Sequence, residues 1–150
     1  MEDLLVLAKL RLEEMLTYFG ANANVKAEID GSTLELSVAS DDTGRLIGRH
    51  GETLAALQQL INAIVRAQTT EHVYVSVDIA DYKKGRAEQL GEQALADAKQ
   101  VAETGQTKHL RPMNAAERRV IHMALAEDPA VETDSEGDGR DRHVVIRPKA

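Results

Sequence analysis

The sequence predicts an α+β fold in which two small units are joined by a helix. Some segments space their apolar residues as helices do, and others alternate apolar and polar residues as strands do. The chain has 150 residues, enough for one ordinary domain or two small ones, and 43% are hydrophobic. A polar, alanine-rich segment separates the two ends. We therefore expect domains at residues 1–80 and 105–150, connected by a helix at 81–104.

The first unit reads helix, strand, strand, short helix, loop, helix, strand. Gly20 ends the first helix, and the pair Asp30-Gly31 is a strong hairpin turn between the first two strands. The expected elements are a helix at 3–19, strands at 25–29 and 33–38, a short helical turn at 43–48, a helix marked by Leu54 to Val65, and a strand at 73–77.

The connecting helix carries only a narrow apolar stripe, and Gly105 is well placed to end it. Gly85 and Gly91 each cost roughly 1 kcal/mol relative to Ala inside a helix. These glycines weaken the start of the segment, which we interpret as a linker helix with a hinge.

The second unit begins near Gln106. Asn114 and Glu117 form a capping-box-like start for a helix that runs to about Ala126. Residues 131–133 and 143–147 are then expected to pair as strands across the turn Gly137-Asp138-Gly139.

The segment Gly48-Arg49-His50-Gly51 is the first candidate site. Glycine lets a backbone approach a ligand closely, and the helix after Gly51 would direct unpaired N–H groups at that ligand. Arg49, and His50 when protonated, add positive charge, and Ile47 beside them would contact bases. In KH domains a Gly-x-x-Gly loop holds single-stranded nucleic acid in this way. Taken alone the four residues are a weak signal, because a plain two-glycine turn fits them too.

The second candidate site lies on the helix after Asn114. Arg118 and His122 are four residues apart and share one face, whereas Arg119 points elsewhere. Arginine offers a planar fork of donors suited to phosphate, and Arg111 could join the same patch. The alternative from the residues alone is a solvated arginine beside a half-buried structural histidine.

Composition excludes several classes of function. Without cysteine there are no disulfides or thiolate sites, and no apolar run is long enough to span a membrane. Glu2 and Asp3 stand where a signal peptide would carry positive charge, so we expect a cytoplasmic protein. The net charge of −7 argues against indiscriminate nucleic-acid binding, although basic residues concentrate at the two candidate sites.

No catalytic, metal or cofactor pattern stands out. The acidic run Asp134 to Gly139 lacks the glutamate of a calcium loop, since Val145 occupies that place, and we interpret it as a solvated hairpin turn. The five histidines show no paired ligand spacing, and no serine lies in a nucleophile elbow. We expect neither an enzyme, nor a metal site, nor a cofactor.

Together the two segments resemble a known family. Residues 111–122 look like the Arg-x-x-x-His single-stranded nucleic-acid-binding domain, with Arg118 and His122 at its two named positions. Residues 46–54 resemble the KH loop of the bacterial Jag, or SpoIIIJ-associated, proteins, and residues 131–137 and 142–148 look like the end of the second domain in that family. The likeness covers nearly the whole chain in the right order and spacing.

The resemblance implies a type II KH domain followed by a small α/β Arg-x-x-x-His domain. It implies binding of single-stranded RNA, with single-stranded DNA left open, and a role as a post-transcriptional regulator or RNA chaperone linked to cell elongation, division and shape. It also implies a small KH-domain partner or a homodimer. The chain begins at the first KH helix, so we expect it to lack the extra N-terminal domain of many relatives. The alternative is a protein-interaction scaffold that dimerises through its KH fold and binds RNA weakly or not at all.

Overall fold

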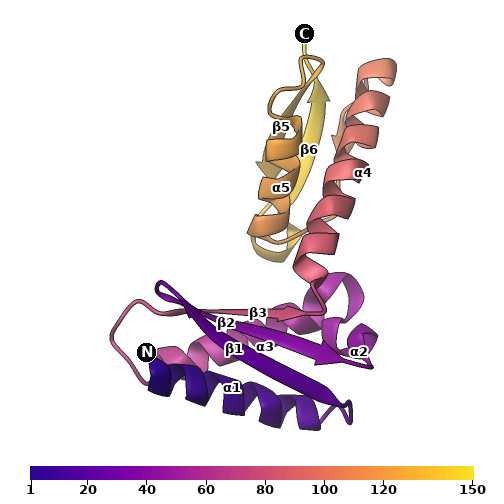
Figure 1. Cartoon of the computed structure of the whole chain (residues 1–150). Coiled ribbons are helices and arrows are strands. Elements are labelled where there is room, and N and C mark those ends of the chain that lie inside the picture. The colour runs from indigo at the N-terminus through magenta and orange to yellow at the C-terminus, as the bar shows by residue number, and fades with distance from the viewer. The chain divides into compact units, whose positions relative to one another are not determined.

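The computed structural model describes all 150 residues, which form two compact units, Met1–Lys83 and Lys84–Ala150. Each unit has its own sheet and its own buried core (Figure 1). No helix combines the length and the apolar character that a membrane span requires.

The first unit contains every element that the sequence predicts there, in the predicted order. These elements are α1 (Glu2–Thr17), β1 (Ala23–Asp30), β2 (Thr33–Ser40), α2 (Thr43–Ile47), a 3₁₀ turn η1 (Arg49–Gly51), α3 (Glu52–Arg66) and β3 (Tyr74–Ile79). In the three-stranded sheet β2 lies in the centre, antiparallel to β1 and parallel to β3.

The core of the first unit lies between the sheet and the helices α1 and α3, which cover one of its faces (Figure 1). Strand residues alternate across the sheet, so one set faces these helices while the other faces solvent. Fully buried side chains from each layer meet in this core, among them Leu12, Leu36, Ile61 and Val77. An aliphatic core of this kind agrees with the aromatic content of only 3%.

The second unit packs two helices on an antiparallel sheet of three strands. Its elements are α4 (Tyr82–Thr104), which starts in the last residues of the first unit, β4 (Lys108–His109), α5 (Ala115–Leu125), β5 (Val131–Glu136), a 3₁₀ turn η2 (Gly139–Asp141) and β6 (His143–Pro148). The strand order is β4-β6-β5. The predicted hairpin is present, with Glu136 opposite His143 and Val131 opposite Pro148.

Two details of this sheet differ from the sequence interpretation. Strand β5 continues to Glu136, so Asp134 to Glu136 are strand residues and only the remainder of the acidic run forms the turn. Strand β4 has no counterpart among the expected elements. It has two residues, too few to show any alternation, and its pairing with β6 defines it.

Most of helix α4 is part of the second unit rather than a free-standing spacer. Its apolar stripe is buried against Ile121 of α5 and Val144 and Ile146 of β6. The stripe consists of Leu90, Ala94, Ala98 and Val101. The helix runs without a break through Gly85 and Gly91. Gly105 ends it as predicted, at φ +69°, with its N–H donating to the Val101 carbonyl at 2.8 Å.

The predicted start of α5 is half confirmed. The Asn114 side chain accepts a hydrogen bond from the Glu117 N–H at 2.9 Å, as an N-cap should. The Glu117 carboxylate does not complete a capping box. It instead accepts from Arg86 Nε of α4 at 3.0 Å, in an ion pair whose side chains are only 19% and 14% exposed. This pair therefore joins α4 to the first turn of α5.

Candidate nucleic-acid interface

The glycine loop of the first unit is a tight turn between α2 and α3. Gly48, His50 and Gly51 all have positive φ, at 74°, 54° and 78°. His50 is one of three non-glycine residues in the chain with this backbone conformation. The turn leaves Arg49 and His50 exposed at its tip, while Ile47 before it is half-buried against the core.

The fold itself requires both glycines, because a side chain at either position would meet neighbouring atoms. A Cβ on Gly48 would lie 2.2 Å from Thr53 Oγ1, and one on Gly51 would lie 2.9 Å from a ring carbon of Tyr82. Any other residue would also be strained at these φ values. The loop geometry is thus determined by close packing inside the first unit.

Helix α3 begins directly after this loop. Gly51 is the N-cap and no side chain caps the helix. The Glu52 N–H bonds to the Arg49 carbonyl, and the next N–H groups of the first turn point out of the helix end. The Arg49 guanidinium makes no hydrogen bond or ion pair within the chain. Two glycines, free amide donors and an unpaired cation therefore meet at one point, an arrangement suited to a phosphate group.

An open pocket of about 250 Å³ lies beside α3. Its first lining residue, Gln58, follows the start of α3 by six residues, which corresponds to roughly 9 Å along the helix axis because each residue adds about 1.5 Å. Tyr74 of β3 contributes an aromatic side chain that is 44% exposed, and Arg66 contributes a cation. The lining residues are Gln58, Gln59, Asn62, Ala63, Arg66 and Tyr74. The sequence does not predict this pocket, because polar residues on an exposed helix face carry no signal.

Two of the lining residues, Asn62 and Gln58, belong to a polar network that covers the free edge of β3. Asn62 bonds both backbone groups of Val75, and Gln58 Oε1 accepts from the Val77 N–H at 3.0 Å and from Lys83 Nζ at 2.8 Å. Burial lowers the pKa of Lys83 below its ordinary value, and the carboxylates of Asp78 and Glu35 oppose that shift. The edge strand is therefore closed to further strand pairing at these positions.

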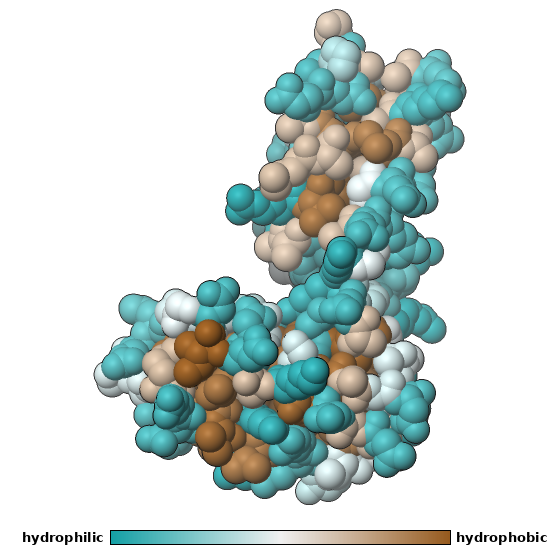
Figure 2. Space-filling model, viewed as in Figure 1, coloured by the Kyte–Doolittle hydropathy of each residue, from teal (hydrophilic) through white to brown (hydrophobic).

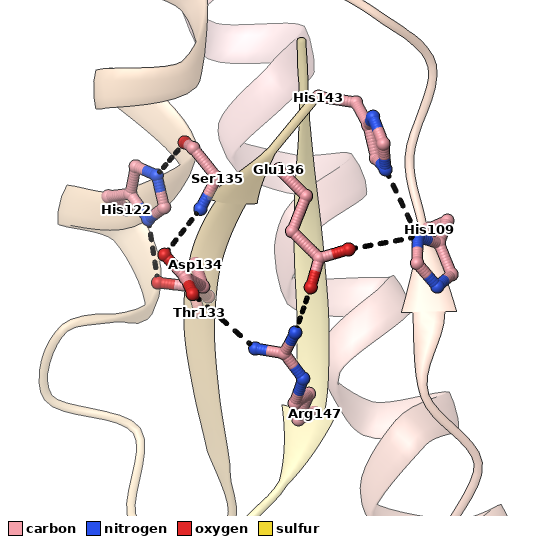
Figure 3. A network of polar contacts seen from close by, with 8 residues as sticks. All are labelled: His109, His122, Thr133, Asp134, Ser135, Glu136, His143 and Arg147. Carbon is pink, nitrogen blue, oxygen red and sulfur yellow. Dashed lines mark hydrogen bonds and ion pairs between the residues drawn. The ribbon is translucent and has the colours of Figure 1, made fainter. Parts of the chain in front are cut away.

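In the second unit Arg118 and His122 lie on α5 as predicted, but each is bonded within the chain. Arg118 Nη1 donates to the Met113 carbonyl at 2.7 Å, which fixes the loop before α5. The two ring nitrogens of His122 lie 2.7 Å from Thr133 Oγ1 and 2.9 Å from Ser135 Oγ (Figure 3). Both side chains thus form hydrogen bonds inside the second unit. The hydroxyl partners of His122, Thr133 and Ser135 on β5, could not be predicted from the sequence.

The structure divides the predicted site residues between the units. Ile47 to Gly51 lie in the first unit, where Arg49 and His50 are exposed, Ile47 and Gly48 are half-buried and Gly51 is buried. Arg111, Arg118 and His122 belong to the second unit, where Arg111 is exposed in the loop before α5 and Arg119 is exposed on α5.

Comparisons with known proteins match both units to families. Residues 9–79 match the KhpA/KhpB KH domain, and residues 88–148 match the Arg-x-x-x-His domain. These matches confirm the α+β fold class with its two successive modules. A KhpA relative from Treponema pallidum is 40% identical over 45 residues, which are 30% of this chain and 56% of that protein.

Similar proteins that match most of the chain carry the name RNA-binding protein KhpB. One from Clostridium symbiosum is 35% identical over 140 residues, 92% of this chain and 63% of the relative. One from Lactiplantibacillus plantarum is 35% identical over 127 residues, 85% of this chain but 39% of the relative. The Bacillus subtilis protein is 31% identical over 144 residues, 95% of this chain and 69% of the relative. This chain thus spans less than two thirds of the first two relatives, and it belongs to the KhpB family, also known as the Jag or SpoIIIJ-associated proteins.

Proposed function

We propose that this chain binds single-stranded RNA, held mainly by the loop Gly48-Arg49-His50-Gly51. The observation that supports the proposal is that this loop lies at the start of α3. No side chain caps that helix end, and Arg49 beside it is unpaired. The names of the KhpB relatives support it, since they are called RNA-binding proteins. These families are binding families rather than known enzyme families, and we propose no catalytic role.

At the loop, backbone N–H groups and Arg49 would hold the sugar–phosphate backbone of about four nucleotides. Protonated His50 would add a second charge. Ile47 would contact a base, and the exposed ring of Tyr74 in the α3 pocket offers a surface on which another base can stack. Stacking of this kind tolerates any base, so the strand would be held with little sequence preference.

The second unit would supply a weaker contact through Arg111, Arg118 and His122. Arg118 uses one of its five donors on Met113, so the others remain for a phosphate. His122 has both nitrogens engaged, which leaves its ring face for a base. Two weak sites on one chain raise affinity through effective concentration when both can engage one strand.

In the cell we propose a cytoplasmic regulator of RNA, or an RNA chaperone, linked to cell elongation and division. A small single-KH protein is the partner that we propose, because a KhpA relative matches part of this chain.

The test is RNA affinity of the purified chain, measured by fluorescence anisotropy with an unstructured single-stranded oligonucleotide at low salt. Arg49→Asp with His50→Asp should abolish binding without changing the fold. The matched control is Asn24→Asp with Lys26→Asp, which makes the same change of charge on exposed positions of β1. Equal loss in both double variants would show that net charge, and not the loop, governs affinity.

A second candidate function is a protein-interaction scaffold. Figure 2 shows apolar residues gathered over α1 and β1 on the visible face of the first unit. Val6 and Leu10, four residues apart on α1, are 57% and 52% exposed, and Ile29 of β1 is 41% exposed. If the wild-type chain has no RNA affinity even at low salt, this candidate replaces the first.

A further inference from the structure

On the face of the second sheet that lies away from α4 and α5, the side chains are polar apart from the buried Val145 of β6. Strand residues alternate between two faces. Residues that bond to α4 and α5, such as Lys108, Thr133 and Ser135, point to the inner face. The outer face therefore carries the alternate positions, and it includes His109, Asp134, Glu136, His143 and Arg147 (Figure 3).

Three of these side chains converge although they are far apart in sequence. The register places Glu136 opposite His143 and His109 opposite Val145, two residues farther along β6. His109 Nδ1 lies 3.0 Å from His143 Nε2 and 4.0 Å from Glu136 Oε2. One nitrogen from each histidine and one carboxylate oxygen all lie within 4.8 Å of one another. Ligand atoms of a tetrahedral zinc ion are about 3.3 Å apart at bond lengths near 2 Å, so small side-chain rotations suffice.

Two atoms of this cluster that face away from its centre, His143 Nδ1 and Glu136 Oε1, have hydrogen-bonding partners that orient the side chains. His143 Nδ1 lies 2.8 Å from the Asp141 carbonyl oxygen, to which it can only donate, so its proton sits on Nδ1 and the lone pair of Nε2 faces the cluster. Arg147 Nη2 donates to Glu136 Oε1, which turns Oε2 toward His109. Outer hydrogen bonds of this kind commonly orient metal ligands.

The metal-free arrangement has a proton where the ion would bind. Because His143 Nε2 is an acceptor, His109 Nδ1 must carry the proton of the 3.0 Å hydrogen bond between the rings. Metal binding would move that proton to the other ring nitrogen of His109 or release it to solvent. Glu136 supplies one negative charge to offset the metal, and Asp134 partly neutralises Arg147, whose Nη1 lies 3.7 Å from it.

We propose that His109, His143 and Glu136 form a binding site for a divalent transition metal, with Zn²⁺ as the ion that fits best. Two imidazoles and one carboxylate match the donor preference of zinc, whereas Mg²⁺ and Ca²⁺ prefer all-oxygen sites. A fourth coordination position stays open to water. The ion would join all three strands, and it would fix the two-residue strand β4 to the sheet from the outer face.

The test is a calorimetric titration of Zn²⁺ into the full chain, freed of metal by a chelator and of any histidine tag. We expect saturable binding of one zinc per chain. His109→Ala and His143→Ala should each weaken affinity at least tenfold. His72→Ala, which removes an exposed histidine of the first unit, is the matched control and should leave affinity unchanged.

Glu136→Gln keeps the shape and an acceptor for Arg147 while removing the ligand charge, and it should also weaken zinc affinity at least tenfold. Imidazole ¹⁵N spectra of the wild-type chain provide a readout that needs no variant. Zinc should shift the ring nitrogens of His109 and His143 and leave those of His72 unchanged. The proposal is overturned by an absence of saturable binding, by wild-type affinity in the His109 and His143 variants, or by one zinc shared between two chains.

Discussion

Asn62 and Val75 exchange two hydrogen bonds across the free edge of the first sheet. The Val75 N–H donates to Asn62 Oδ1 at 2.8 Å, and Asn62 Nδ2 donates to the Val75 carbonyl at 2.7 Å. Asn62 is only 8% exposed, so an amide side chain here bonds the backbone groups that a fourth strand would otherwise bond.

Replacing Asn62 by leucine should destabilise the first unit by about 1–3 kcal/mol, because the backbone groups of Val75 would be left buried without partners. Urea unfolding followed by circular dichroism measures this change. Gln59→Leu, on an exposed position of the same helix, is the control and should change the free energy of unfolding by no more than about 0.5 kcal/mol. Equal effects of the two substitutions would show that the bonds to Val75 contribute nothing.

Alanine at Gly48 or at Gly51 should cost about 1–3 kcal/mol, the usual penalty for a side chain at a left-handed backbone position. The clash with Thr53 adds to that cost at Gly48. Gly44→Ala is a matched control in the preceding helix α2, where nothing lies within 4 Å of the added Cβ. That control should be neutral or stabilising, since alanine favours helix. Thermal unfolding of the three variants measures these changes in stability. An equal loss of stability in Gly44→Ala would show that the backbone conformation of the loop is not the cause.

If Arg49 contacts a phosphate, Arg49→Ala should weaken RNA binding and reduce the dependence of log affinity on log salt by about 0.7, the value for one contact to a single strand. Affinities measured over a series of salt concentrations give this slope. Arg11→Ala is the control because Arg11 lies on α1, paired with Glu14 at 2.7 Å. A slope that stays at the wild-type value would remove Arg49 from the interface.

Arg118→Ala should destabilise the second unit by about 1–2 kcal/mol, because it removes a charged hydrogen bond to the Met113 carbonyl. Arg119→Ala, one residue farther along and exposed, should have almost no effect on stability. RNA affinity is then measured at a temperature where both variants are folded. Unchanged affinity in Arg118→Ala would leave this arginine with a structural role alone.

The glycine loop illustrates how far local pattern reaches. Its two glycines, the helix that follows and the position of Arg49 at the tip could all be predicted, because each depends on residues within one or two turns of chain. The same holds for the Asn114 cap and the Gly105 helix end. The two-residue strand β4 and the extension of β5 to Glu136 could not be predicted, since strand pairing depends on partners far along the chain.

Arg118 and His122 show the limit within the candidate site. Their spacing placed them correctly on one helix face, but it could not show that Met113, Thr133 and Ser135 already occupy their polar atoms. The α3 pocket could not be predicted for a similar reason. Its other lining residues lie on helix α3, whereas Tyr74 comes from strand β3.

By itself, the sequence determined the α+β class, the order of nearly all the elements, the two basic segments and the resemblance to the KhpB family. Those properties depend on the spacing and identity of residues that are close together in the sequence. Tertiary structure alone decided which distant side chains meet: Asn62 at the edge of β3, Glu117 with Arg86, and His109 with Glu136 and His143. The physical reason is that strand register and helix packing minimise the free energy of the whole unit, so no local pattern records where residues 109, 136 and 143 will converge.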